Sequence, residues 1–169
     1  SETAVYFKER FSIPESLEEI KSTWMDMARD KYTNKVPLKP GAREFLVWLR
    51  QQGIRTGIAS SNGIELVETV LKAQGIQEYL ESVHTCCEVP KGKPAPDIYL
   101  LVAETLGVKP EECLVFEDVP MGILAGKNAG MRVCAVEDTF SASQREEKKE
   151  LADYYIESYD EIPRERMQP

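Results

Sequence analysis

Three short polar clusters in this 169-residue sequence carry side chains that could handle a phosphate and a divalent cation. The first cluster is Ser60-Ser61-Asn62, which follows a short apolar run and precedes a predicted helix. Hydroxyl groups and free backbone N–H groups at the start of a helix form a good cradle for an anion. An ordinary Ser/Asn helix cap explains the same residues about as well.

The second cluster contains Lys93, in the segment Lys91-Gly92-Lys93-Pro94-Ala95-Pro96-Asp97. The prolines on either side of Ala95 stiffen the backbone that follows Lys93. A lysine on a stiff mount can act as a fixed point charge for a phosphate. Taken alone, the segment is more typical of a loop with a solvated lysine.

The third cluster is the adjacent pair Glu117 and Asp118, which follows the apolar run 113–116. Two neighbouring carboxylates repel each other unless a cation or hydrogen-bond donors compensate their charge. Oxygen ligands, in a chain with a single histidine, favour Mg²⁺ over zinc. The alternative interpretation is a pair of acids that cap the helix behind them.

Strands and helices alternate after residue 41, and this order explains how the three clusters could meet. The expected strands span 54–60, 82–86, 113–116, 132–136 and 154–156. The expected helices span 42–52, 62–75, 96–106, 121–129 and 143–151. This pattern predicts an α/β fold: a Rossmann-like parallel sheet with helices on both faces. Ligands of such sheets bind at the carboxyl ends of the strands, where all three clusters fall.

Two helices, at about 3–11 and 16–31, precede this region, and a Pro/Gly-containing linker follows them. Ser16 and Glu19 have the spacing of a capping box at the start of the second helix. The expected organisation is therefore a small helical unit over 1–35 and an α/β unit over 36–169.

Composition narrows the classes of partner. The chain has 29 acidic and 21 basic side chains and a net charge of −8, so no general attraction to nucleic acid or an anionic membrane is expected. Its four cysteines include no Cys-x-x-Cys pair, and no apolar run is long enough to span a bilayer. These features favour a reducing, cytoplasmic location.

The three clusters together resemble the motifs of the haloacid-dehalogenase-like hydrolase superfamily, in the branch of β-phosphoglucomutase and small sugar-phosphate phosphatases. Ile58-Ala59-Ser60-Ser61-Asn62 is similar to its phosphate-binding serine motif, and Gly92-Lys93-Pro94-Ala95-Pro96-Asp97 to its lysine motif. Val115-Phe116-Glu117-Asp118-Val119-Pro120-Met121-Gly122-Ile123 is similar to its magnesium motif. The resemblance implies that Ser60 and Lys93 are catalytic, that Ser60, Ser61, Asn62 and Lys93 bind phosphate, and that Asp118, assisted by Glu117, holds Mg²⁺.

The sequence departs from that family at one motif. The family carries an early strand that ends in Asp-x-Asp, whose first Asp is the nucleophile, and this chain contains no Asp-x-Asp. The resemblance places the missing strand between the strand ending at Ser60 and the one ending at Phe116. We consider three explanations: an N-terminally incomplete chain, replacement of the strand by the segment Ala4-Val5-Tyr6-Phe7 or by a partner chain, or a degenerate binding protein.

The expected function is that of a magnesium-dependent phosphatase or phosphomutase acting on a small phosphorylated metabolite, such as a sugar phosphate, through an aspartyl-phosphate. The resemblance implies that residues 1–35 are part of a helical cap and that 36–169 are a core without its first strand. A chain without the nucleophile is expected to be inactive alone. The alternatives are a catalytically inactive module that binds phosphorylated metabolites, and an interaction protein that binds neither phosphate nor metal.

Overall fold

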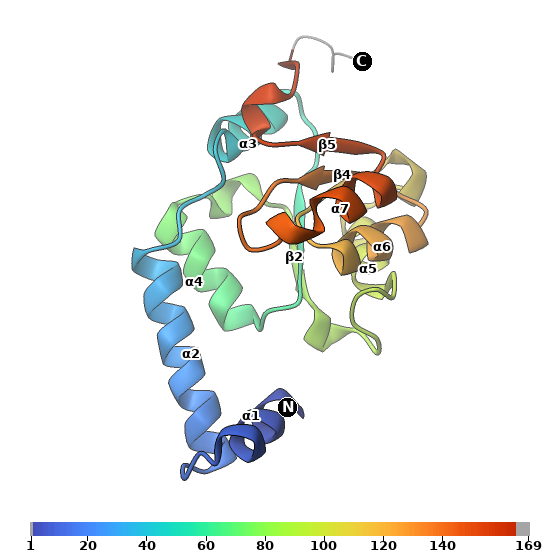
Figure 1. Cartoon of the computed structure of the whole chain (residues 1–169). Coiled ribbons are helices and arrows are strands. Elements are labelled where there is room, and N and C mark those ends of the chain that lie inside the picture. Colours follow the sequence, from blue (N-terminus) through green and yellow to red (C-terminus); the bar gives the residue numbers. More distant parts are fainter. Residues whose placement is uncertain (1, 165–169) are drawn as a thin grey trace.

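The computed structural model describes residues 2–164 as an α/β unit with two helices extending from it (Figure 1). The strands are β1 (Gly57–Ser60), β2 (Ser82–Thr85), β3 (Leu114–Glu117), β4 (Arg132–Val136) and β5 (Tyr154–Ile156). The α-helices are α1 (Glu2–Phe11), α2 (Leu17–Asn34), α3 (Ala42–Gln51), α4 (Ile64–Gln74), α5 (Asp97–Leu106), α6 (Pro120–Asn128) and α7 (Arg145–Leu151). Short 3₁₀ turns, including η4 (Ala142–Gln144) and η5 (Tyr159–Glu161), connect several of these elements.

The strands form two parallel sheets instead of the single expected one. β1 pairs with β2, with Ser60 opposite Thr85. The second sheet has the order β3-β4-β5, with Glu117 opposite Ala135. Within residues 2–164, β1 and β3 are therefore edge strands, each with one paired side.

Helices cover both faces of β3 because its side chains alternate between two apolar clusters. Val115 points into the main core, which also holds buried residues of α5 and α6 such as Ile98 and Ile123. Phe116 points to the opposite face, where its ring packs against Phe45 of α3 with 5.4 Å between centroids. Helix α5 packs on both β1 and β2 and contributes to the core around β3, so it connects the two sheets.

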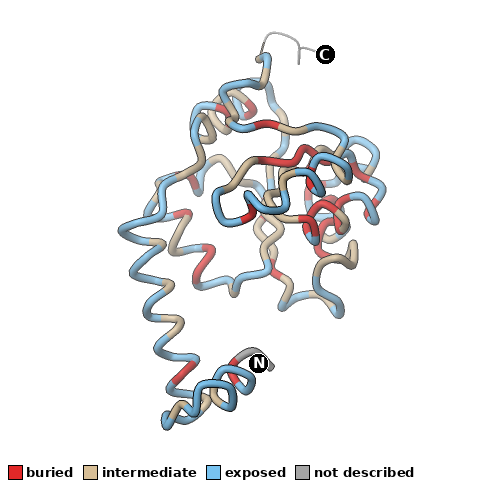
Figure 2. The backbone as a smooth tube through the Cα atoms, in the orientation of Figure 1, coloured by how far each residue is buried: buried red, intermediate tan, exposed pale blue. Residues whose placement is uncertain are grey.

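Helices α1 and α2 extend to one side of the α/β unit, and their exposed surface contrasts with the buried residues gathered around the sheets (Figure 2). Ser16 and Glu19 form the expected capping box at the start of α2. Helix α2 packs along α4, and the Phe7 ring of α1 packs edge-on against Trp24 of α2. None of the helices within the described residues is long and apolar enough to cross a membrane.

The element order matches the sequence prediction closely, with one alternative excluded. β4 and β5 have the predicted bounds, and Gly75 and Gly107 end α4 and α5 in the left-handed conformation that glycine favours. The segment Ala4-Val5-Tyr6-Phe7 cannot replace a strand as considered above, because it lies inside α1. The helix predicted over about 3–11 is therefore confirmed, with Ala4 fully buried and Phe7 packed on α2.

Candidate active site

Ser60, Ser61 and Asn62 lie where β1 ends and the chain turns toward α4. The Ser60 hydroxyl accepts a hydrogen bond from the Asn62 backbone N–H at 3.1 Å, so its own proton can be donated elsewhere. The N-cap of α4 is Gly63, and no side chain caps this helix. The helix-cap alternative is therefore wrong for these three residues, and the start of α4 keeps backbone N–H groups unsatisfied by a capping side chain.

Lys93 connects the carboxyl ends of the two sheets. Its ammonium donates to the Ala59 carbonyl at the end of β1, at 3.1 Å, and forms an ion pair with Glu117 at the end of β3. The Lys93 side chain is only 11% exposed, and the ammonium lies 4.9 Å from the centroid of the Tyr99 ring. The interpretation as a solvated loop lysine is therefore wrong.

Glu117 is the acceptor of a buried network. One of its carboxylate oxygens accepts hydrogen bonds from Lys93 and from the Tyr99 hydroxyl, and the other accepts from the Asp118 N–H at 3.3 Å. Burial, followed by the Glu117 charge, raises the pKa of Tyr99, which keeps this phenol a donor. In this arrangement Glu117 neutralises Lys93, whose ammonium also contacts the Ala59 carbonyl, one residue before Ser60.

Asp118 lies one residue further and is more accessible, with 39% of its side chain exposed. Its Oδ2 atom lies 3.4 Å from the Lys39 ammonium, which also forms an ion pair with Asp138. Its backbone carbonyl accepts a 2.6 Å hydrogen bond from Ser141. The N-cap of α6 is Val119, without a side-chain cap, so neither acid is the helix cap that the alternative interpretation proposed.

The donor chemistry at this end of β3 is compatible with magnesium. Proteins often hold Mg²⁺ through one or two carboxylates, with water and substrate phosphate as the remaining ligands. The Asp118 oxygens are such donors, whereas those of Glu117 already accept hydrogen bonds. Within residues 2–164, no group of three or more His, Cys, Asp or Glu side chains forms a complete metal site. The metal roles of Asp118 and Glu117 stay predictions.

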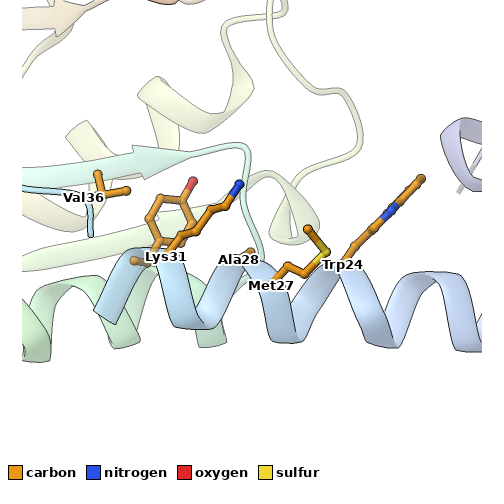
Figure 3. A pocket seen from close by; sticks show the side chains of 6 residues that line it. Trp24, Met27, Ala28, Lys31 and Val36 are labelled. Atoms are coloured by element: carbon orange, nitrogen blue, oxygen red, sulfur yellow. The ribbon is translucent and has the colours of Figure 1, made fainter. Parts of the chain in front are cut away.

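The C-terminal half of α2 reaches this region. The Asn62 amide donates to the Tyr32 hydroxyl at 3.4 Å, so the helical unit contacts the end of β1. Tyr32 lines a hollow of about 300 Å³, and Figure 3 shows Trp24, Met27 and Lys31 projecting from the same side of α2. The hollow is lined by Trp24, Met27, Ala28, Lys31, Tyr32 and Val36.

Sequence reasoning missed several residues of this network: Lys39, Tyr99, Asp138 and Ser141. In the sequence, Lys39 falls in the predicted linker and Tyr99 in a predicted helix. The carboxyl-end rule could have indicated Asp138, because it lies two residues after the end of β4, near the same sheet edge as Asp118 after β3. No sequence pattern indicates Ser141, which reaches Asp118 through the return of the chain after β4.

Comparison with known proteins assigns the chain to a family. Residues 6–130 match the family model of the haloacid dehalogenase-like hydrolases. A probable pseudouridine-5'-phosphatase of Drosophila melanogaster is 38% identical over 71% of this chain and 57% of its own length. Hexitol phosphatase B of Escherichia coli is 32% identical over 75% of this chain and 56% of its own length. The chain thus spans little more than half the length of these relatives.

The crystal structure of CbbY from Rhodobacter sphaeroides in complex with xylulose-(1,5)bisphosphate has the same fold, with a TM-score of 0.79 and 25% identity. The match covers 89% of this chain and 67% of CbbY. This protein belongs to the haloacid dehalogenase-like hydrolase family, and the predicted fold class is confirmed.

Proposed function

We propose that this chain is part of a magnesium-dependent phosphatase or phosphomutase that acts on a small phosphorylated metabolite, such as a sugar phosphate. The main support is the position of Lys93. Its ammonium contacts Ala59 at the carboxyl end of β1 and forms a buried ion pair with Glu117 at the carboxyl end of β3. The family assignment and relatives named as phosphatases support the same reaction class.

In this proposal the end of β1 binds the phosphoryl group. The Ser60 hydroxyl donates a hydrogen bond to a phosphoryl oxygen, and the backbone N–H groups at the start of α4 donate hydrogen bonds to the same anion. Lys93 neutralises a further oxygen, while Glu117 fixes the direction of its ammonium. Ser61 and Asn62, both exposed, are placed at the rim of the cradle.

Asp118 would hold the magnesium ion, with Glu117 assisting through its hydrogen bond to the Asp118 N–H. The bound ion would supply positive charge that offsets the charge of the phosphoryl group. Lys93 would offset the charge of the same group. Phosphoryl transfer depends mainly on positioning and charge neutralisation, and these residues provide both.

The nucleophile belongs to a segment outside these 169 residues, in the same chain or in a partner. We place that segment as a strand between β1 and β3, whose facing edges are the open edges of the two sheets. Such a strand would pair the backbone groups on both edges and bring its last residues beside Lys93. An Asp-x-Asp at that point would supply the aspartyl-phosphate and the general acid/base.

The domain assignment follows from the same proposal. Residues 1–35 would be part of a cap and 36–169 the core that lacks its first strand. The Tyr32–Asn62 contact and the hollow on α2 would place the cap beside the organic part of the substrate. Phosphatase and mutase differ in whether water enters this space, and the proposal covers both.

Phosphate binding tests the proposal directly. Inorganic phosphate is titrated into the chain with Mg²⁺ present and followed by calorimetry. Lys93→Met should weaken binding at least tenfold and Ser60→Ala several-fold, because each removes a donor to the anion. Lys91→Met is the matched control, since this exposed lysine lies two residues away and should leave the affinity unchanged. Equal affinities in all four proteins would contradict the proposal.

Activity is the second test. These 169 residues alone should release no phosphate from sugar phosphates, whereas the chain completed with a strand ending in Asp-x-Asp should. Magnesium-dependent turnover by the chain alone, abolished by Lys93→Met, would show that the nucleophile lies within it. Phosphate binding without turnover in the completed protein would instead establish the alternative, an inactive phosphometabolite-binding module.

A further inference from the structure

Lys39 lies in a connecting segment whose backbone is held by a specific turn. The chain turns at Pro40 and Gly41, where the Pro40 carbonyl accepts a 3.1 Å hydrogen bond from the Tyr159 N–H. Gly41 has a φ of +73°, and a Cβ there would overlap Asp160, so only glycine fits the turn. The turn fixes the backbone beside Lys39, whose side chain reaches the carboxyl ends of β3 and β4.

The Lys39 ammonium lies between two carboxylates. It forms a hydrogen-bonded ion pair with Asp138, donates to the Glu137 carbonyl at 3.1 Å, and lies 3.4 Å from Asp118. Its two stronger contacts are therefore with Glu137 and Asp138, in the segment after β4. Asp138 and Asp118 compete for one positive charge.

The backbone of Asp118 is held independently of Lys39. Ser141, 2% exposed, donates to the Asp118 carbonyl and accepts a 2.9 Å hydrogen bond from Lys148, which is fully buried. This leaves the side chain of Asp118 as the part that Lys39 can influence. Within residues 2–164, Lys39 is the residue that forms an ion pair with that side chain.

We propose that Lys39 and Asp138 are positioning residues that set the affinity of Asp118 for a divalent cation. Asp138 holds the ammonium to one side, so that Asp118 stays open to the ion. The ammonium, in turn, limits how tightly the ion is held, because it repels a cation bound at Asp118. This inference rests on the proposed function, which assigns the cation to Asp118.

The two substitutions should have opposite effects. Lys39→Met removes the repulsion and should tighten cation binding roughly tenfold. Asp138→Asn frees the ammonium to pair fully with Asp118 and should weaken binding by a similar factor. If Lys39 and Asp138 had only structural roles, both substitutions would weaken cation binding, or both would leave it unchanged. In the double variant the effect of Asp138→Asn on cation affinity should be smaller, because the Lys39 ammonium through which Asp138 acts is absent.

The test is a Mn²⁺ titration of the chain, followed by electron paramagnetic resonance at constant pH and ionic strength. Lys35→Met is the control for loss of one positive charge, since this lysine is 67% exposed and paired with Asp30 on α2. Circular dichroism verifies that each variant is folded. Unchanged or weaker binding by Lys39→Met, or additive effects in the double variant, would overturn the inference alone. Binding that is absent, or unaffected by Asp118→Asn, would overturn the proposed metal site and this inference with it.

Discussion

Gly122 leaves the space that the Glu117 carboxylate occupies. A Cβ built on Gly122, in the first turn of α6, would overlap all three atoms of that carboxyl group. Glu117 can therefore lie over the start of α6 and reach Lys93 only because residue 122 has no side chain. A glycine in a helix destabilises the helix by about 1 kcal/mol relative to alanine. Here the glycine is required for the ion pair between Glu117 and Lys93.

Replacing this glycine should damage both stability and the site. Gly122→Ala would force Glu117 away from Lys93 and Tyr99, and the overpacking should cost about 1–3 kcal/mol of unfolding free energy. Phosphate affinity should fall with it, because Lys93 loses its fixed position. Urea unfolding measures the first effect and calorimetry the second.

Gly63→Ala is the matched control for that change. Gly63 also lies at the start of a helix, has a φ of −66°, and has no atom within 4 Å of a built Cβ. Its substitution should leave stability within about 0.5 kcal/mol. A result in which both variants lose the same stability would show that the packing around Glu117 is irrelevant.

Removing the Tyr99 hydroxyl should weaken the same network without disrupting it. Tyr99→Phe deletes one donor to a charged acceptor, and a loss of about 1–2 kcal/mol in unfolding free energy is expected. Because burial and the Glu117 charge raise the pKa of Tyr99, its phenol should not ionise near pH 10 in the folded protein. Absorbance at 295 nm between pH 9 and 11 should therefore be the same for Tyr99→Phe and the unchanged protein.

Tyr154, 51% exposed, provides the comparison for stability. Tyr154→Phe should leave the free energy of unfolding unchanged, because the Tyr154 hydroxyl forms no hydrogen bond with other groups of residues 2–164. A larger loss from Tyr154→Phe than from Tyr99→Phe would contradict the network described here.

Glu137 should make the stability of the protein sensitive to acid. Hydrogen bonds from Arg145 and then Tyr155 lower the pKa of Glu137 to about 2, below its ordinary value of about 4.3. A lowered pKa in the folded state contributes stability that is present above about pH 4.3 and is lost as the pH falls toward 2. The stability difference between the unchanged protein and Glu137→Gln should therefore shrink between pH 7 and pH 3 in urea titrations.

Glu146→Gln serves as the reference for this pH dependence. Glu146 lies on the neighbouring helix α7, with 84% of its side chain exposed and only a loose contact with Lys149. Its substitution should alter stability little at either pH. A Glu137→Gln difference that stays constant over this range would disprove the assigned pKa shift.

Phe7 should control the order of α1 without affecting the core. Helix α1 packs mainly on α2, where the Phe7 ring contacts Trp24 at 5.3 Å between centroids. Phe7→Ala should raise amide hydrogen exchange over residues 2–11 while β3 and β4 keep their protection, because regions with few contacts open locally. Faster exchange throughout the chain would show instead that α1 is coupled to the whole fold.

The sequence by itself determined the element order and the residues of the candidate site. Alternating apolar runs and glycine stops marked β4, β5 and the ends of α4 and α5. Because parallel strands place their carboxyl ends at one edge, the same pattern indicated that Ser60, Lys93 and Asp118 share a region. These features are local or periodic, so one-dimensional reasoning can detect them.

Only the tertiary structure decided how these side chains are paired. It placed Glu117 on Lys93 and Lys39 between Asp118 and Asp138, with ion-pair partners 24 to 99 residues apart in sequence. It also divided the strands into two sheets instead of one, with β1 and β3 at sheet edges within residues 2–164. Such outcomes depend on long-range packing and charge compensation, which residue types and spacing do not encode.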